Sequence, residues 1–177
     1  MTIQTAAAPV PDARLLAPGA VSPAEHDWLG DAIELAENNV AAGGGPFGAL
    51  IVRDGEVLAR SGNRVTESFD PTAHAEVMAI RAACSRIRDF RLTGTTLISS
   101  CEPCPMCITA ALWARVSRIV YAADRQAAEG AGFDDREFYD LLATPVQDWP
   151  VPVVRIAHAD SDVPFRSWST AHYKIEY

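Results

Sequence analysis

The sequence HAEVMAIRAACSRIRDFRLTGTTLISSCEPCPMC, residues 74–107, sets the arrangement expected for the rest of the chain. His74-Ala75-Glu76 opens this stretch and Pro103-Cys104-Pro105-Met106-Cys107 closes it. Residues 77–102, between the two motifs, have the length of one helix, a turn and one strand. If each motif opens a helix, the two helix N-termini can meet at one edge of a sheet. One imidazole, two thiols and one carboxylate would then face one another.

This set of side chains suits a catalytic zinc ion. Zn²⁺ binds thiolate and imidazole in a tetrahedron, and a catalytic site has three protein ligands and an open fourth position. Cys104 and Cys107, at i and i+3, lie on one face of a first helical turn, where the helix terminus and a metal lower the thiol pKa. We therefore expect His74, Cys104 and Cys107 to hold one Zn²⁺ per subunit. Glu76 is placed to carry the proton of the water that the metal acidifies, and H-x-E…P-C-x-x-C is typical of zinc-dependent base and nucleoside deaminases.

Other uses of the cysteines stay open. A lone C-x-x-C is more often a redox pair or half of a structural zinc site, and a structural site needs a fourth ligand. Cys101 is the nearby candidate, because it forms a second, overlapping C-x-x-C with Cys104. Cys101 also ends the apolar run TTLISS and is expected to belong to a strand. Four cysteines in 177 residues without a secretory segment do not suit a disulfide framework.

Length and charge narrow the class of protein. A chain of 177 residues suits one domain that buries roughly 70% of its unfolded surface, so the fold does not need zinc. A net charge of −8 argues against a nucleic-acid partner, because such binding relies on clustered Lys and Arg. No apolar run approaches the ~20 residues of a membrane span, and the first residues lack the apolar core of a signal peptide. Reduced, metal-ready cysteines predict a cytoplasmic protein.

The remaining pattern predicts alternating helices and strands. Residues 1–21, rich in Ala and Pro, are expected to form a flexible N-terminal tail, and residues 22–177 the deaminase domain. Ser22-Pro23-Ala24-Glu25 has the form of a capping box. Helices are expected over residues 23–41, 74–88, 104–115, 137–142 and 165–173, and strands over residues 50–52, 57–59, 95–100, 118–123 and 151–156. The predicted fold is α/β, a three-layer α/β/α sandwich with a central mixed five-stranded sheet.

Three further positions each have two interpretations. Phe47, beside Gly48, offers a flat face to an aromatic ring or caps the sheet as a core residue. The amide of Asn63 pairs with a purine edge or closes a turn, and spacing alone favours the turn. Asp135, in the loop GAGFDD, belongs to a pair of carboxylates that is usually a solvated helix cap. A catalytic role for Asp135 requires this loop to reach the metal.

These residues together give the chain a family resemblance. It resembles the cytidine deaminase-like superfamily, and within it the bacterial guanine deaminases. HAE with PCxxC is shared by enzymes that act on cytosine, cytidine, guanine and tRNA adenosine, whereas AGFDD and the C-terminal segment resemble guanine deaminases and not tRNA deaminases. The segments that carry the resemblance are GGPFGA at 44–49, DPTAHAEV at 70–77, SCEPCPMC at 100–107, WAR at 113–115, AGFDD at 131–135, PF at 164–165 and the closing Glu-Tyr.

The resemblance also implies a substrate site and an assembly. Phe47, Asn63 and Ala75 match positions that hold a purine base. The family suggests a homodimer with exchanged C-terminal segments. In such a dimer Asp135 and Tyr177 of one subunit would close the partner's site.

The activity implied by the resemblance is the hydrolysis of guanine to xanthine and ammonia. Glu76 would pass the proton of the attacking water to ring N3, and Glu76 or Asp135 would protonate the leaving amino group. HAE and PCxxC specify the type of reaction but not the shape of the substrate pocket. The open alternatives for the substrate are therefore guanosine, cytosine or cytidine, and an aminotriazine such as ammeline. The acidic surface argues against tRNA adenosine. A non-catalytic zinc-binding scaffold is disfavoured, because metal binding does not need Glu76.

Overall fold

The computed structural model describes residues 20–133 and 135–176. The chain forms two compact units, Met1–Arg136 and Glu137–Tyr177. Most of the predicted N-terminal tail, and Tyr177, lie outside the described residues. Within them, no helix is both long enough and apolar enough to cross a membrane.

The first unit is built on a mixed sheet with the strand order β2-β1-β3-β4. Its strands are β1 (Gly48–Arg53), β2 (Glu56–Gly62), β3 (Thr96–Cys101) and β4 (Arg118–Ala123). β1 is antiparallel to both β2 and β3, and β3 is parallel to β4. Asp54 and Gly55 join β1 to β2 with φ values of 50° and 83°. Positive φ at both positions is what a two-residue type I′ hairpin turn requires, so the predicted hairpin is confirmed.

The predicted fifth strand, residues 151–156, is wrong. These residues form no strand, and the sheet of the described chain has four. Val151 is 66% exposed and Ile156 is 81% exposed. The run V-P-V-V-R-I has strand-like composition, but Pro152 removes a backbone donor that a sheet ladder would use. A strand also needs a free sheet edge, which local composition does not encode.

The predicted long helices are confirmed, with ends that differ by a few residues. Ser22 caps the first one: its Oγ accepts from the Glu25 backbone N–H at 3.2 Å, and the Glu25 carboxylate accepts from the Ser22 N–H at 2.8 Å. Two short helices and a 3-10 turn were not predicted, because so few residues leave no periodic apolar pattern. The helical elements are α1 (Pro23–Ala41), α2 (Val65–Ser68), α3 (Ala75–Ile87), α4 (Pro105–Trp113), α5 (Arg125–Gly130), α6 (Arg136–Leu142), η2 (Val146–Asp148) and α7 (Val163–Thr170).

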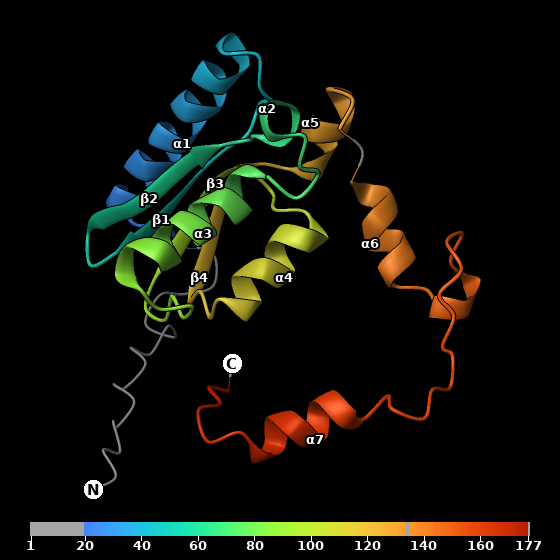
Figure 1. The fold of residues 1–177 in the computed structure, drawn as a ribbon. Coiled ribbons are helices and arrows are strands. Elements are labelled where there is room, and N and C mark those ends of the chain that lie inside the picture. Colours follow the sequence, from blue (N-terminus) through green and yellow to red (C-terminus); the bar gives the residue numbers. More distant parts are fainter. Residues whose placement is uncertain (1–19, 134, 177) are drawn as a thin grey trace, which may run out of the picture. The chain divides into compact units, whose positions relative to one another are not determined.

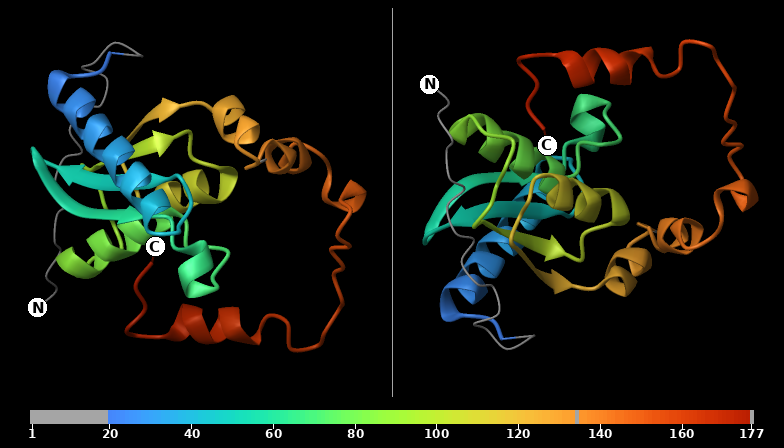
Figure 2. Two further views of the ribbon diagram at one scale, coloured as in Figure 1. Left: turned by 90° about the horizontal axis from the view of Figure 1, so that it is seen from above. Right: turned by 90° about the horizontal axis from the view of Figure 1, so that it is seen from below.

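Helices cover both faces of the sheet, because alternate residues of a strand point to opposite sides. Leu50 and Val52 of β1 pack with Ala32 of α1 on one face. Ala49 and Ile51 of the same strand pack on the other face with residues of α3 and α4. Figure 1 shows the three layers, and Figure 2 views the sheet from the α1 side and from the α3 and α4 side. The three-layer α/β/α arrangement is therefore confirmed for the first unit.

The second unit, Glu137–Tyr177, has a different character. None of its described residues is buried. Phe165 and Trp168, three residues apart in α7, are 74% and 42% exposed. The second unit therefore has no apolar core of its own.

Candidate metal centre and active site

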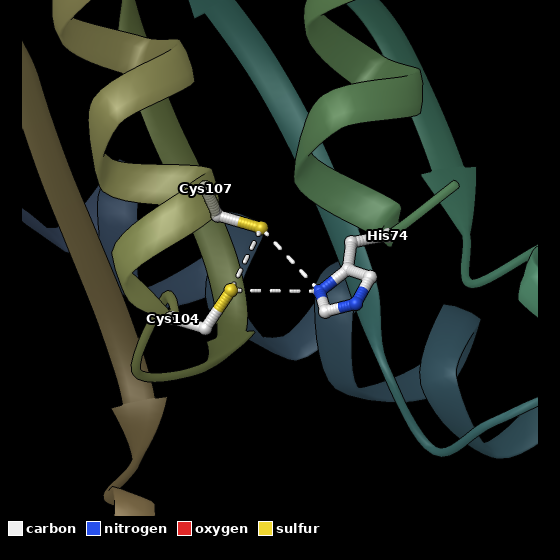
Figure 3. Close-up of side chains that lie close together, drawn as sticks. All are labelled: His74, Cys104 and Cys107. Carbon is white, nitrogen blue, oxygen red and sulfur yellow. Dashed lines mark hydrogen bonds between the residues drawn. The ribbon is translucent and has the colours of Figure 1, made fainter. Parts of the chain in front are cut away.

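The two motifs of residues 74–107 meet as the sequence predicted. His74 is the N-cap residue of α3 and Cys104 is the N-cap residue of α4. The sulfurs of Cys104 and Cys107 lie 3.6 Å apart. His74 Nδ1 lies 3.6 Å from the Cys104 sulfur and 3.5 Å from the Cys107 sulfur. The three side chains converge from the first turns of the two helices (Figure 3).

These distances fit a single tetrahedral zinc ion. Bonds of ~2.3 Å to sulfur and ~2.0 Å to nitrogen at tetrahedral angles separate two sulfurs by about 3.8 Å, and sulfur from nitrogen by about 3.5 Å. Both cysteines are buried and His74 is half-buried. The cysteines are free thiols, so they form no disulfide. The His74, Cys104 and Cys107 group thus fits one zinc ion per subunit.

Cys101 lies outside this group. Its thiol contacts the carbonyl oxygen of Asp124 at 3.7 Å, and burial raises its pKa to about 11. Among the described residues, the only cluster of three or more potential ligands is His74, Cys104 and Cys107. Three protein ligands leave the fourth tetrahedral position open, as in catalytic and not structural zinc sites.

The pKa values of the two cysteines shift in opposite directions. A hydrogen bond from the Cys107 thiol, opposed by burial and aided by His74, lowers the pKa of Cys104 to about 4. The same hydrogen bond and burial raise the pKa of Cys107. The hydrogen bond with Cys104 also raises the pKa of His74. Metal binding therefore has to displace the Cys107 proton, which makes zinc affinity dependent on pH.

Glu76 lies beside the metal group in the first turn of α3. Its side chain is buried, with 5% of the residue exposed. One carboxylate oxygen accepts from the Ser99 hydroxyl at 3.2 Å, and the other from the Cys107 thiol at 3.5 Å. Burial raises the pKa of Glu76. A carboxyl group with a raised pKa, held beside a metal, can accept a proton and return it near neutral pH.

A pocket of about 460 Å³ opens beside the metal group. It brings together six of the residues that the sequence selected, namely Phe47, Asn63, His74, Glu76, Cys104 and Asp135. Ala75 is not among the lining residues; it is fully buried in the core between the sheet and α3. Tyr177 lies outside the described residues. All the residues that line this pocket belong to the unit Met1–Arg136.

The pocket has an aromatic wall and a fixed amide. The ring of Phe47 meets the ring of Phe133 edge to face, with centroids 4.9 Å apart. Asn63 Oδ1 accepts from the Val65 backbone N–H at 3.1 Å, so this amide closes a turn and lines the pocket at the same time. The two interpretations of Asn63 are therefore compatible.

Asp135 lines the same pocket with one unsatisfied carboxylate oxygen. Its Oδ1 is buried and has no hydrogen-bond partner within the described chain. Burial raises the pKa of Asp135, and the negative charge of Cys104 adds to the shift. A buried oxygen without a partner is costly, so Asp135 is suited to receive a polar group of a ligand.

Sequence reasoning missed several residues of this site. The pattern assigns no role to Phe133, which lies within AGFDD, and places Ser99 only in the predicted strand over residues 95–100. Glu102 lines the pocket and accepts hydrogen bonds from the backbone N–H and Nε of Arg125 at 3.2 and 3.1 Å. Two adjacent serines at the end of an apolar strand were the available signal, because a buried hydroxyl needs a partner.

Comparison with known families agrees with this geometry. Residues 23–123 match the family described as the cytidine and deoxycytidylate deaminase zinc-binding region. The match runs from the start of α1 to the end of β4, so it includes the whole sheet and the metal group. The chain belongs to this deaminase family.

Guanine deaminases and tRNA adenosine deaminases are among the relatives of this deaminase. It is 44% identical to guanine deaminase of Bacillus subtilis over 151 residues, which is 85% of this chain and 97% of that protein. The X-ray structure of guanine deaminase from Bacillus subtilis has a TM-score of 0.83 and covers 86% of this chain and 98% of its own. A structure described as guanine deaminase from Nitrosomonas europaea is 32% identical, with a TM-score of 0.61, over 66% of each chain. A tRNA-specific adenosine deaminase of Agrobacterium fabrum is 50% identical, but over only 44% of this chain and 51% of that protein.

Proposed function

We propose that this deaminase hydrolyses guanine to xanthine and ammonia. The observation that carries the proposal is the extent of the similarity to guanine deaminase, which covers 85% of this chain and nearly all of that relative. That alignment is longer than the matched zinc-binding region, residues 23–123. Similarity to the tRNA enzyme covers less than half of this chain. The shared metal region specifies the reaction class, and similarity beyond it favours guanine as substrate.

The side chains that line the pocket suit a flat heterocycle with polar groups at its edge. Phe47 and Phe133 supply aromatic faces against which a planar ring packs well. The oxygen of the Asn63 amide is engaged by Val65, so its NH₂ group is the part that can donate to a ring nitrogen or a carbonyl of the base. The orphan oxygen of Asp135 can accept from an amino or ring N–H group.

The mechanism uses proton transfer by the chain's own carboxyl groups. Zinc, when bound, lowers the pKa of a water molecule and so supplies a nucleophile near neutral pH. Glu76 takes the proton of that water and gives it to ring N3 as C2 of guanine becomes tetrahedral. Glu76 or Asp135 then carries the proton of the new C2 hydroxyl to the amino group, the C–N bond breaks as C2 becomes a carbonyl, and ammonia leaves to give xanthine. His74, Cys104 and Cys107 are proposed as the zinc ligands.

A substrate panel tests the proposal. Ammonia release is measured with guanine, guanosine, cytosine, cytidine, ammeline and a tRNA anticodon stem-loop that contains adenosine. We expect kcat/KM for guanine to exceed that for each of the others by at least ~10-fold, because differential transition-state binding sets this ratio. A higher value for another member would reassign the substrate. Zinc-loaded protein that releases ammonia from none of them would be a non-catalytic scaffold.

We further propose that two chains form a homodimer with exchanged C-terminal segments. The support is that no described residue of 137–176 is buried, although α7 carries the large apolar residues Phe165 and Trp168. Large apolar side chains that are exposed close together on one helix are typical of an interface. The proposal assigns Tyr177, outside the described residues, to the partner's active site.

Co-expression of two impaired variants tests the exchange, because the mixed dimer is then compared with the low activity that each variant has alone. One chain carries Glu76→Gln, and the other lacks residues 174–177. If the segments are exchanged, the mixed dimer contains one site with an intact Glu76 and an intact tail, so activity returns. If each tail serves its own chain, neither chain has a complete site and mixing restores nothing. Each variant expressed alone is the control.

A further inference from the structure

Asn39, near the C-terminal end of α1, has no assigned role and an unusual environment. It is 6% exposed, whereas its neighbour Asn38 on the same helix is exposed. The side-chain nitrogen of Asn39 donates to the carbonyl oxygen of Gly45 at 2.8 Å and to that of Asn63 at 2.9 Å. Gly45 precedes β1 and Asn63 follows β2. One amide group thus joins the segment that enters β1 to the segment that leaves β2.

Two positions beside this amide, Gly44 and Gly62, have no room for a side chain. A Cβ at Gly44 would lie 2.4 Å from the side-chain nitrogen of Asn39, and a Cβ at Gly62 would lie 2.4 Å from its side-chain oxygen. Neither distance is possible without displacing the amide. The glycines at these positions therefore allow two backbone segments to approach Asn39 closely.

Both joined segments carry groups of the proposed purine pocket. Gly45 lies two residues before Phe47, and the Asn63 backbone N–H donates to the Phe47 carbonyl at 3.0 Å. Gly45, Phe47 and Asn63 all line the pocket, and Asn39 does not. Any effect of Asn39 on a ligand therefore passes through the two segments it joins, which carry Gly45, Phe47 and Asn63.

An amide side chain is suited to donate to two carbonyl oxygens at once. Its NH₂ group supplies two hydrogens to two carbonyl oxygens, in a buried hydrogen bond with Asn63 and a partly buried one with Gly45. A carboxylate of the same shape has no hydrogen to give and would repel both oxygens. We propose that Asn39 is a positioning residue of the purine pocket, which sets the spacing between Phe47 and Asn63. The proposal rests on the proposed action on a purine base.

Isosteric variants test this role in the zinc-loaded full-length protein. Asn39→Asp keeps the shape and removes both donors, and Asn39→Leu removes them without adding charge. We expect KM for guanine to rise at least ~10-fold while kcat changes less than ~3-fold, because the change acts on binding groups. Zinc content per chain, measured by metal analysis, should stay at the wild-type value. Asn38→Asp, the same change on the exposed neighbour, should leave KM unaltered.

Gly62→Ala provides a second route that keeps both donors. Its new Cβ would press on the side-chain oxygen of Asn39 from a residue that does not line the pocket. We expect a smaller rise in KM, of ~3-fold or more, again without loss of zinc. An unchanged KM in both Asn39→Asp and Gly62→Ala would overturn the inference.

Hydrogen exchange separates this inference from the choice of substrate. The amides of Asn63 and Val65, which donate to Phe47 and to the Asn63 side chain, should exchange at least ~10-fold faster in Asn39→Asp. The amides of β3 and β4 should keep their wild-type rates. Uniform acceleration across the sheet would make Asn39 a general stabilising residue and overturn the proposal. Failure of the wild type to deaminate guanine would instead remove the proposed function, and the exchange pattern would still decide the role of Asn39.

Discussion

The two units of the chain differ in how much apolar surface they bury. Met1–Arg136 has a sheet whose Leu50 and Leu97 are fully buried between layers of helices, and it contains the metal group and every residue of the adjoining pocket. In Glu137–Tyr177 no described residue is buried. The first unit therefore holds the residues of the proposed chemistry, whereas the described part of the second has no apolar core.

The largest effect expected within the first unit comes from Glu76→Gln. The substitution keeps the shape of the side chain and removes the proton relay, so kcat should fall by about 10³-fold or more. Zinc content should be unchanged, because Glu76 is not a ligand in the proposed site. Ammonia release and metal analysis on the same preparation measure both quantities.

Glu67→Gln is the matched control for this change. Glu67 belongs to α2, and its side chain is 66% exposed and paired with Arg64. Its loss should leave kcat within ~2-fold, since an exposed pair contributes little. Full activity in Glu76→Gln would contradict the proposed mechanism.

The next effect separates metal binding from folding. Cys107→Ser removes one of three ligands and should weaken zinc binding by more than ~100-fold, beyond the loss typical of an outer-shell change. The apolar layers around the sheet do not involve zinc, so far-UV circular dichroism should keep its wild-type form. Cys101→Ser, which removes a thiol outside the group, should bind zinc as the wild type does. Unfolding of Cys107→Ser would show instead that the metal holds the first unit together.

A deletion probes the second unit. Removing residues 174–177 should lower kcat/KM by about 10-fold, because closure of a site positions substrate and excludes water. The midpoint of thermal unfolding should change by less than ~2 °C, since none of residues 174–176 is buried in the chain. Deleting residues 1–19 should alter neither quantity. Equal losses of activity and stability would make the tail a structural element.

The sequence predicted most of the first unit because its signals are local. The capping box at Ser22, the Asp54-Gly55 turn and the apolar runs of β1 and β3 each specify an element without reference to distant residues. The metal site could be predicted for the same reason, since His74 and the two cysteines sit at helix starts whose spacing the chain itself sets.

The errors have a different origin. Whether residues 151–156 form a strand depends on an available sheet edge, which composition does not reveal. The roles of Ser99 and Glu102 depend on partners 23 positions away in each case. Asn39 gave no signal at all, because an asparagine near the end of a helix is common and only the backbone around it shows its contacts.

The smallest expected effects compare one ion pair from each unit. Glu25 of α1 pairs with Arg118 of β4 at 2.7 Å, with side chains 7% and 29% exposed. Asp162 pairs with Arg166 in α7, where the side chains are 59% and 63% exposed. Glu25→Gln should lower the free energy of unfolding by about 2 kcal/mol, as expected for hydrogen bonds to a charged group. Asp162→Asn should change it by less than about 0.5 kcal/mol, because solvent screens exposed pairs.

The pH dependence of the Glu25 pair sharpens this comparison. Burial acts to raise the pKa of Glu25, but hydrogen bonds from the Ser22 backbone and from Arg118 more than offset it, so the pKa lies below its ordinary value of 4.5. A carboxyl group with a lowered folded-state pKa stabilises the fold above its unfolded-state pKa, and this contribution is lost as the pH falls through the folded-state value. The difference in stability between wild type and Glu25→Gln should therefore be constant from about pH 6 upward and shrink below about pH 4. Urea unfolding across this range measures the difference in unfolding free energy. A difference that grew on acidification would mean that folding favours the neutral carboxyl group of Glu25 over the carboxylate, which would contradict the lowered pKa.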